Sequence, residues 1–328
     1  MDPVLTPAGV DAIALSRFTW LLCGGAALVF LLVMAVLGGA LRGGGKVLRW
    51  PRWLAVAVLA PAIVLAALFA YATWGGVPYG TAADGRPAGM PAGALVIRVT
   101  AHMWWWEVRY PGPDGGIVLA NEVHLPAGRT VWLALDSADV IHTFWVPALS
   151  GKVDMLPGKV RHLPLTAVRP GTWRGQCAEY CGLQHARMAL RVVAHAEPDF
   201  DRWLARQAMP AVADGGRHAA ARALFAARCA ACHTVRGAGA GTAPGARTAL
   251  MAQFDQAGPV GRPGPVGPDL THVASRTALG AGALPNSPGA LAAWLAAPHR
   301  YKEGIRMPDP RLAAGDLQAL AAWLETLQ

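Results

Sequence analysis

The chain has 328 residues, of which 54% are hydrophobic, and its formal net charge at pH 7 is +9. This length allows two soluble domains of about 100 residues each besides a membrane anchor. No segment holds a dense run of lysine and arginine, so the positive charge gives little support to a nucleic-acid-binding function.

Two long charge-free runs near the N-terminus predict two transmembrane helices, at about 18–41 and 53–74. The first would form roughly 36 Å of helix at about 1.5 Å per residue, enough to cross a hydrocarbon core of about 30 Å. Pro61 inside the second run predicts a kink. Two buried core helices are the alternative, but both runs are too long and too uniformly apolar for that interpretation.

The charges around these runs predict the orientation of the hairpin. The link at 42–52 carries four basic residues and no acid, whereas the N-terminal arm has Asp2 and Asp11 against Arg17. The positive-inside rule then places the link in the cytoplasm and both termini outside. We therefore expect a two-span protein of the bacterial plasma (inner) membrane, with everything after Trp74 on the periplasmic or extracellular side. A cleaved signal peptide is not expected, because the start is acidic and the apolar run exceeds a signal core.

The rest of the chain changes pattern twice. Residues 1–93 end in an exit loop rich in Gly, Pro and Ala, and residues 94–196 contain short β-type runs separated by turns. These runs are LVIRVT, WWWEVRY, IVLANEVHL, TVWLALDS, IHTFWV, VRHLPLTA, TWRGQ and ALRVVAH. Their spacing predicts an antiparallel sandwich or barrel. Residues 197–218 form a helix-prone linker, and residues 219–328 have helical periodicity, interrupted by a loop-like stretch at about 234–264.

Soft metal ligands are concentrated in one stretch of the β region. GQCAEYCGLQHARM places two thiols, one imidazole and one thioether within twelve residues, and DVIHTFWVP offers a further imidazole. These side chains are Cys177, Cys181, His185, Met188 and His142. Such a set selects copper, with zinc as the main competitor. A disulfide between the two cysteines is the alternative that an oxidising compartment permits, and the accompanying imidazoles and thioether argue against it.

A second motif opens the helical region. CAACH at 229–233 has the spacing of a covalently attached c-type haem, in which Cys229 and Cys232 form thioethers and His233 is an axial ligand. A zinc site or a disulfide would use the same cysteines. Cys23, the fifth cysteine, lies within the first apolar run and is expected to be a small packing residue.

Three stretches carry a resemblance to subunit II of haem–copper cytochrome c oxidases. They are AHMWWWEVRYP, DVIHTFWVPALSGKVDMLPG and RPGTWRGQCAEYCGLQHARM. The resemblance implies a cupredoxin sandwich that holds a binuclear copper A centre. Cys177 and Cys181 would bridge two copper ions, and His142 and His185 would each bind one.

The same resemblance implies three further roles. Met188 and the backbone carbonyl of Glu179 would be the weak copper ligands. The Glu179 carboxylate would bind a magnesium or manganese ion shared with subunit I. Trp104 matches the position that passes electrons to copper.

The helical region resembles small class I-like cytochromes c through GPDLTHVASR and GIRMP. This similarity implies an all-α domain with Met307 as the sixth haem ligand and Arg276 near a haem propionate. Met251 is a competing thioether without a following proline. A methionine ligand raises the reduction potential, as suits an electron carrier.

Together these features resemble the caa-type variant of oxidase subunit II, a membrane-anchored multidomain chain with a fused cytochrome c. The resemblance implies that electrons enter at the haem, reach copper A and pass to subunit I, where oxygen is reduced and protons are pumped. Expected partners are subunits I and III, membrane lipid, and a cytochrome c or a cytochrome c reductase complex as donor. The linker predicts a tethered encounter of the two domains. The alternatives are a copper A-containing subunit of a nitric oxide reductase and a non-catalytic membrane copper or redox-sensing protein.

Overall fold

The computed structural model describes residues 6–42, 50–74, 87–112, 116–211, 216–237 and 267–328. The chain divides into two compact units. One is Leu15–Ala92, and the other combines Met1–Ala14 with Gly93–Gln328.

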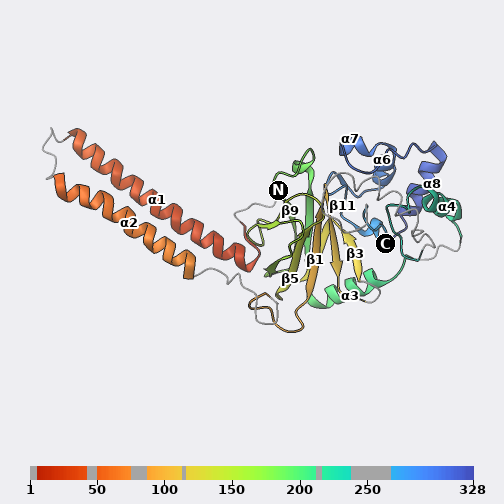
Figure 1. Cartoon of the computed structure of the whole chain (residues 1–328), viewed down its shortest axis with the longest axis horizontal. Helices are drawn as coiled ribbons and strands as arrows, with labels where there is room; N and C mark the ends of the chain where they lie inside the picture. The colour runs from red at the N-terminus through yellow and green to blue at the C-terminus, as the bar shows by residue number, and fades with distance from the viewer. Residues whose placement is uncertain (1–5, 43–49, 75–86, 113–115, 212–215, 238–266) are drawn as a thin grey trace. The chain divides into compact units, whose positions relative to one another are not determined.

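The smaller unit contains most of helix α1 (Val10–Arg42) and all of helix α2 (Trp50–Trp74), which lie side by side (Figure 1). The rings of Phe18 and Tyr71 stack with centroids 5.2 Å apart. Among the described residues, Val10–Gly39 is long and apolar enough to cross a membrane, and Val58–Tyr71 is a shorter apolar helix. Helix α2 continues through Pro61, so the proline does not end it. The second membrane span stays a prediction.

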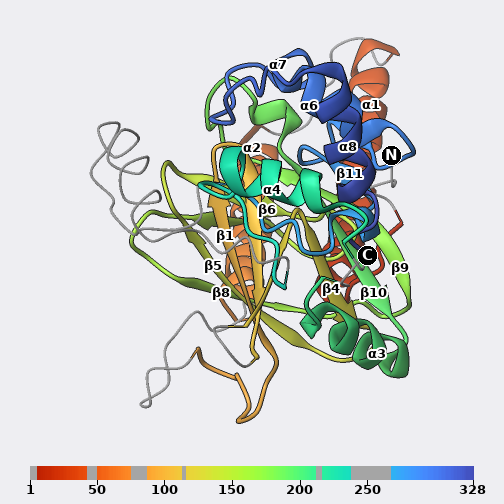
Figure 2. The ribbon, with the colours of Figure 1, turned by 90° about the vertical axis from the view of Figure 1, so that its right-hand side faces the viewer.

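The larger unit contains a sandwich of two five-stranded sheets (Figures 1 and 2). The first sheet has the order β3-β2-β1-β5-β8 and the second has the order β4-β10-β9-β6-β7. The strands of the first sheet are β1 (Val96–His102), β2 (Trp105–Tyr110), β3 (Ile117–Ala120), β5 (Val131–Ser137) and β8 (Arg161–Leu165). Those of the second are β4 (Glu122–Pro126), β6 (His142–Trp145), β7 (Val153–Met155), β9 (Gly171–Cys177) and β10 (Ala189–His195).

Alternating apolar residues explain why these segments form a sandwich. In β1, every second side chain is fully buried, namely Ile97, Val99 and Ala101. The period of two places them on one face of the strand, toward the core between the sheets. Trp106 and Phe144 meet edge to face in that core, with centroids 6.0 Å apart.

The sandwich departs from the sequence-based expectation in two ways. The run at 117–125 is two strands, because Asn121 adopts a φ of 64° and its side-chain oxygen accepts a hydrogen bond from the Trp106 N–H at 2.9 Å. The chain changes sheets at this residue, so β3 and β4 lie in different layers. The expected all-antiparallel order is also wrong, since β1 pairs with β5 and β4 pairs with β10 in parallel.

The linker forms helix α3 (Glu197–Ala208), which packs on the second sheet. Its buried Trp203 stacks on His124 with centroids 4.0 Å apart. At its far end, the Arg236 guanidinium donates to the carbonyls of Gln207 and Ala208, at 2.6 and 3.1 Å. Because the linker contacts both domains, it is not a free tether.

In the described part of the C-terminal domain, four α-helices lie to one side of the sandwich (Figures 1 and 2). They are α4 (Ala219–Arg228), α6 (Ala290–Ala296), α7 (Pro298–Tyr301) and α8 (Ala314–Leu324). Phe225 and Trp323 join α4 to α8 through an edge contact, with centroids 5.3 Å apart.

The sequence led us to expect an all-α domain, but the structure shows that this domain also contains strands. Two short strands, β11 (Ala278–Leu279) and β12 (Leu284–Pro285), form a ribbon. A tight turn joins them, in which Gly280, Ala281 and Gly282 all have positive φ. Glycine adopts positive φ readily, and helical periodicity in the sequence does not predict a turn of this kind. Most of the loop-like stretch at 234–264, including Met251, lies outside the described residues.

Candidate metal centre and cofactor cavity

The sulfur-rich loop lies at one end of the second sheet because of strand pairing. Cys177 ends β9, and the loop that follows returns as the neighbouring strand β10. On its other side β9 pairs with β6, where Phe144 is opposite Cys177. His142 begins β6, two residues before Phe144, and therefore lies beside the loop.

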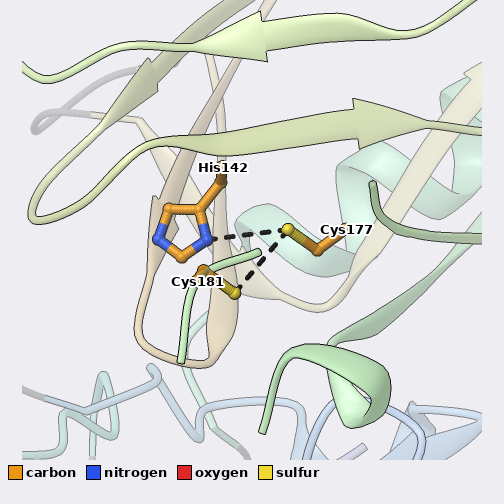
Figure 3. A group of neighbouring side chains, drawn as sticks. All are labelled: His142, Cys177 and Cys181. Carbon is orange, nitrogen blue, oxygen red and sulfur yellow. Dashed lines mark hydrogen bonds between the residues drawn. The ribbon is translucent and has the colours of Figure 1, made fainter. Parts of the chain in front are cut away.

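Six donor groups converge there, and Figure 3 shows His142, Cys177 and Cys181 pointing at one another. The two sulfur atoms of Cys177 and Cys181 are 3.8 Å apart. Cys177 Sγ lies 3.8 Å from His142 Nδ1 and 3.1 Å from the Glu179 carbonyl. Cys181 Sγ lies 3.7 Å from His185 Nδ1 and 3.9 Å from Met188 Sδ. Both cysteines are free thiols, so the structure contains no disulfide between them.

The environment of the two thiols favours a cation between them. Hydrogen bonds from Cys181 and His142 hold the pKa of the Cys177 thiol well below its usual range. The pKa of Cys181 is raised, first by its hydrogen bond to Cys177 and then by burial. One thiolate thus forms readily, whereas the second needs a compensating positive charge. A soft metal ion supplies that charge, so the donor set fits copper.

Asp139, which the sequence analysis did not single out, orients His142. Its Oδ1 accepts from His142 Nε2 at 2.8 Å, and its Oδ2 accepts from the Met103 N–H at 2.7 Å. Burial alone would raise the pKa of Asp139, but the hydrogen bonds from His142 and Met103 outweigh it and keep the pKa below the usual value. The carboxylate therefore fixes the ring with Nδ1 facing the thiols, as outer-shell partners of metal ligands do. An acid three residues before the histidine was the available sequence signal.

The predicted haem residues surround one cavity of about 420 Å³ in the C-terminal domain. Its lining includes Cys229, Cys232, His233, Arg276 and Met307. The two cysteines follow the last residue of α4, whereas Arg276 and Met307 come from later loops. A cavity of this size is typical of a cofactor site.

Three details test whether this cavity suits a haem. The Nδ1 of His233 is held by the Pro268 carbonyl at 2.8 Å, which leaves Nε2 free to be a ligand. The backbone at Gly267 packs closely against the His233 ring, and only a glycine fits there because an added Cβ would lie 2.6 Å from Cε1 of His233. Arg276 is partly buried, and its Nε atom is buried without a hydrogen-bond partner in the described structure. An anionic group at the edge of a cofactor, such as a propionate, would satisfy it.

Trp104 joins the two sites. Its side chain is among those that line the cavity, and its indole N–H donates to the Cys181 carbonyl at 2.8 Å. Gly182, with a φ of 106°, lies against the same ring, since a Cβ there would be 3.1 Å from Cζ2. The indole of Trp104 therefore contacts the copper loop, and Trp104 lines the same cavity as the candidate haem residues. Two further residues each contact the other domain: Lys302 binds the Trp104 carbonyl, and Glu122 binds Thr277. Sequence reasoning missed both.

Comparison with known proteins agrees with this two-part architecture. Residues 115–195 match the family described as cytochrome c oxidase subunit II, periplasmic domain, and residues 218–328 match the family described as cytochrome c. The chain combines a subunit II periplasmic domain with a cytochrome c domain. We call the sandwich, whose strands run from Val96 to His195, the copper domain, and residues 218–328 the haem domain.

Individual relatives of this chain are named cytochrome c oxidase subunit 2. A cytochrome c oxidase subunit 2 from Alkalihalophilus pseudofirmus is 33% identical over 239 residues, covering 71% of this chain and 61% of the relative. One from Bacillus subtilis is 29% identical, covering 72% of this chain and 63% of the relative. The chain thus spans less than two-thirds of the length of either. A crystal structure of the periplasmic domain of subunit II from Bradyrhizobium japonicum is 28% identical over 36% of this chain and 95% of that chain, with a TM-score of 0.34.

Proposed function

We propose that this chain is the electron-input subunit of a haem–copper terminal oxidase, of the type with a fused cytochrome c. The chain would take electrons at its haem domain, pass them to the copper domain and deliver them to subunit I for reduction of oxygen to water coupled to proton translocation. The observation that carries the proposal is Trp104, which lines the haem cavity and donates a hydrogen bond to the copper loop.

Each candidate ligand has a place in this proposal. Cys177 and Cys181 would bridge two copper ions, His142 and His185 would bind one each, and Met188 and the Glu179 carbonyl would be weak ligands. In the haem domain, Cys229 and Cys232 would hold the haem covalently, with His233 and Met307 as axial ligands. When bound, these groups supply one-electron oxidation and reduction.

The protein's own part is to hold these groups still and close together. The donors of the copper loop are fixed by the pairing of β9 with β6 and β10, so little of the scaffold needs to move. Asp139 keeps the His142 ring oriented, and Arg276 offers a buried donor to an anionic haem edge. Trp104 shortens the gap between the two sites with a rigid aromatic ring.

The proposed partners lie beyond this chain. The Glu179 side chain is exposed, so its carboxylate is available for a magnesium or manganese ion shared with subunit I. Tyr180 and Leu183, on the same loop, are 76% and 63% exposed. Exposed apolar side chains of this kind suit a partner interface. We propose that both helices α1 and α2 span the membrane, that this surface contacts subunit I, and that subunit III completes the assembly.

Purification of the native complex from membranes tests this function. Co-purification with a multi-span subunit, bands of haem c and of a second haem in the reduced spectrum, and oxygen uptake from a reduced donor are the expected results. Nitric oxide consumption without oxygen uptake would favour a nitric oxide reductase. A chain that binds copper but passes no electrons onward would favour a copper-handling or sensing protein.

A further inference from the structure

Lys302 is a buried lysine at the boundary between the haem domain and the copper domain. It follows α7, and it is 2% exposed. Its ammonium donates to the carbonyl of Trp104 at 2.6 Å and to the carbonyl of Gly280 at 3.0 Å. The first acceptor belongs to the copper domain and the second to the haem domain, so one side chain connects the two.

This placement has a cost. Both acceptors are neutral carbonyl oxygens, and burial lowers the pKa of Lys302 to about 7. Burying a cation without a carboxylate partner is unfavourable, and an apolar side chain would avoid that penalty. We therefore infer that Lys302 has a specific role at this position.

The geometry around Trp104 provides one. Its indole N–H is held by the Cys181 carbonyl of the copper loop, while its backbone carbonyl is held by Lys302 of the haem domain. Trp104 and Lys302 both line the haem cavity, as does Met307, five residues after the lysine. Trp104 is thus held at two points, its indole by the copper loop and its backbone carbonyl by the haem domain.

A separate contact holds the domains together. The buried Glu122 of β4 accepts hydrogen bonds from the N–H of Thr277, at 2.6 Å, and from its hydroxyl. Its other carboxylate oxygen faces His124. Removal of the lysine contact alone would leave this connection in place, so the two contacts have separable effects.

We propose that Lys302 is a positioning residue, which holds Trp104 in the orientation that connects the haem cavity to the copper loop. The proposal rests on the proposed function, since it concerns transfer between the same two sites. Electron transfer from haem to copper would then occur within one fixed arrangement of the two domains. The haem domain would not need to diffuse on its linker to reach the copper domain.

The test compares Lys302→Met with the wild type in the full chain loaded with haem and copper. Lys159→Met, at an exposed lysine of the copper domain, controls for loss of a charge. Thr277→Val, which weakens the Glu122 contact, controls for general loosening of the interface. The rate of haem-to-copper transfer is followed after flash reduction of the haem, at several solvent viscosities. Amide hydrogen exchange of the segment 96–106 is measured in the same proteins.

In Lys302→Met we expect transfer to slow by roughly tenfold or more and to become dependent on viscosity, because misplacement by about 1 Å has effects of this size. Exchange in the segment 96–106 should become faster, while haem reduction by the donor and both reduction potentials stay unchanged. Lys159→Met should match the wild type, and Thr277→Val should retain most of the transfer rate.

Two results would overturn the positioning role. One is an unchanged transfer rate in Lys302→Met, and the other is an equal loss in Thr277→Val. If Lys302→Met does not retain haem, Lys302→Leu, which also removes the N–H donor, takes its place with the same criteria. A wild-type chain that shows no haem-to-copper transfer would instead refute the proposed function, and this inference with it.

Discussion

Cys177 and Cys181 differ from an ordinary cysteine pair because each also faces a histidine. Cys177 Sγ lies 3.8 Å from His142 Nδ1, and Cys181 Sγ lies 3.7 Å from His185 Nδ1. If both thiolates bridge two copper ions, one alone should hold neither ion well. We predict two coppers per wild-type chain and loss of both in Cys177→Ser, measured by metal analysis and electron paramagnetic resonance.

The exposed Cys23 offers a matched control for this experiment. Cys23→Ser should keep two coppers and an unchanged spectrum, in which one electron is shared by both nuclei. A wild-type chain with a single copper and a four-line spectrum confined to one nucleus would refute the binuclear assignment.

Asp139 supports the same site from outside the ligand set. Because its carboxylate fixes His142 through Nε2, Asp139→Ala should free the ring and weaken copper binding by roughly 10- to 100-fold. Titration of the full chain with copper against a competing chelator measures this change. Asp201→Ala, at an exposed acid of α3, should bind copper like the wild type. Equal affinity in Asp139→Ala would show that the ring needs no such support.

At the scale of elements, the haem cavity depends on close packing between a loop and His233. A Cβ at Gly267 would lie 2.6 Å from the ring, so Gly267→Ala should displace the ring or the loop and destabilise the haem domain by about 1–3 kcal/mol. Thermal unfolding followed through haem absorbance gives the measurement. Gly315→Ala in α8 has open space around the new methyl group and should cause no loss. Similar melting curves for both variants would contradict this view of the loop.

The sequence predicted most of the elements, because strand and helix periodicity are local properties. The run LVIRVT predicted a strand where β1 forms, and the apolar pattern of α8 indicated a helix. The split at Asn121 was missed, since a change of sheet depends on a positive φ and one side-chain hydrogen bond. The ribbon β11–β12 was missed for a similar reason, as its glycine-rich turn has no periodic signal.

The sites show the same division between local and distant information. The candidate copper ligands could be proposed because four of the side chains lie within one short loop, and the candidate haem ligands because CAACH is contiguous. Contacts that join distant segments were not predictable. Lys302 and Trp104 are 198 residues apart in the chain, and Glu122 and Thr277 are 155 apart. Nothing in their local sequence indicates a partner in the other domain.

At the scale of the larger unit, the two soluble domains touch at several places that together limit their relative motion. Helix α3 is fixed to the sandwich through Trp203 and to the haem domain through Arg236. The Ala189 N–H, next to the copper ligand candidate Met188, donates to the Ala281 carbonyl at 3.0 Å. Under the proposed function, a donor would therefore need to reach only the haem domain, and later transfer would take place within the chain.

We propose that electrons pass from the haem domain to copper by way of Trp104. Stopped-flow reduction of the whole complex by its donor, followed separately at haem and copper absorption bands, tests it most directly. Trp105→Phe, at the neighbouring indole that stacks on His102, is the matched control and should behave like the wild type. In Trp104→Phe, haem reduction should stay fast while copper reduction slows by roughly tenfold or more. Copper reduction as fast as in the wild type, or copper reduced before the haem, would contradict the account.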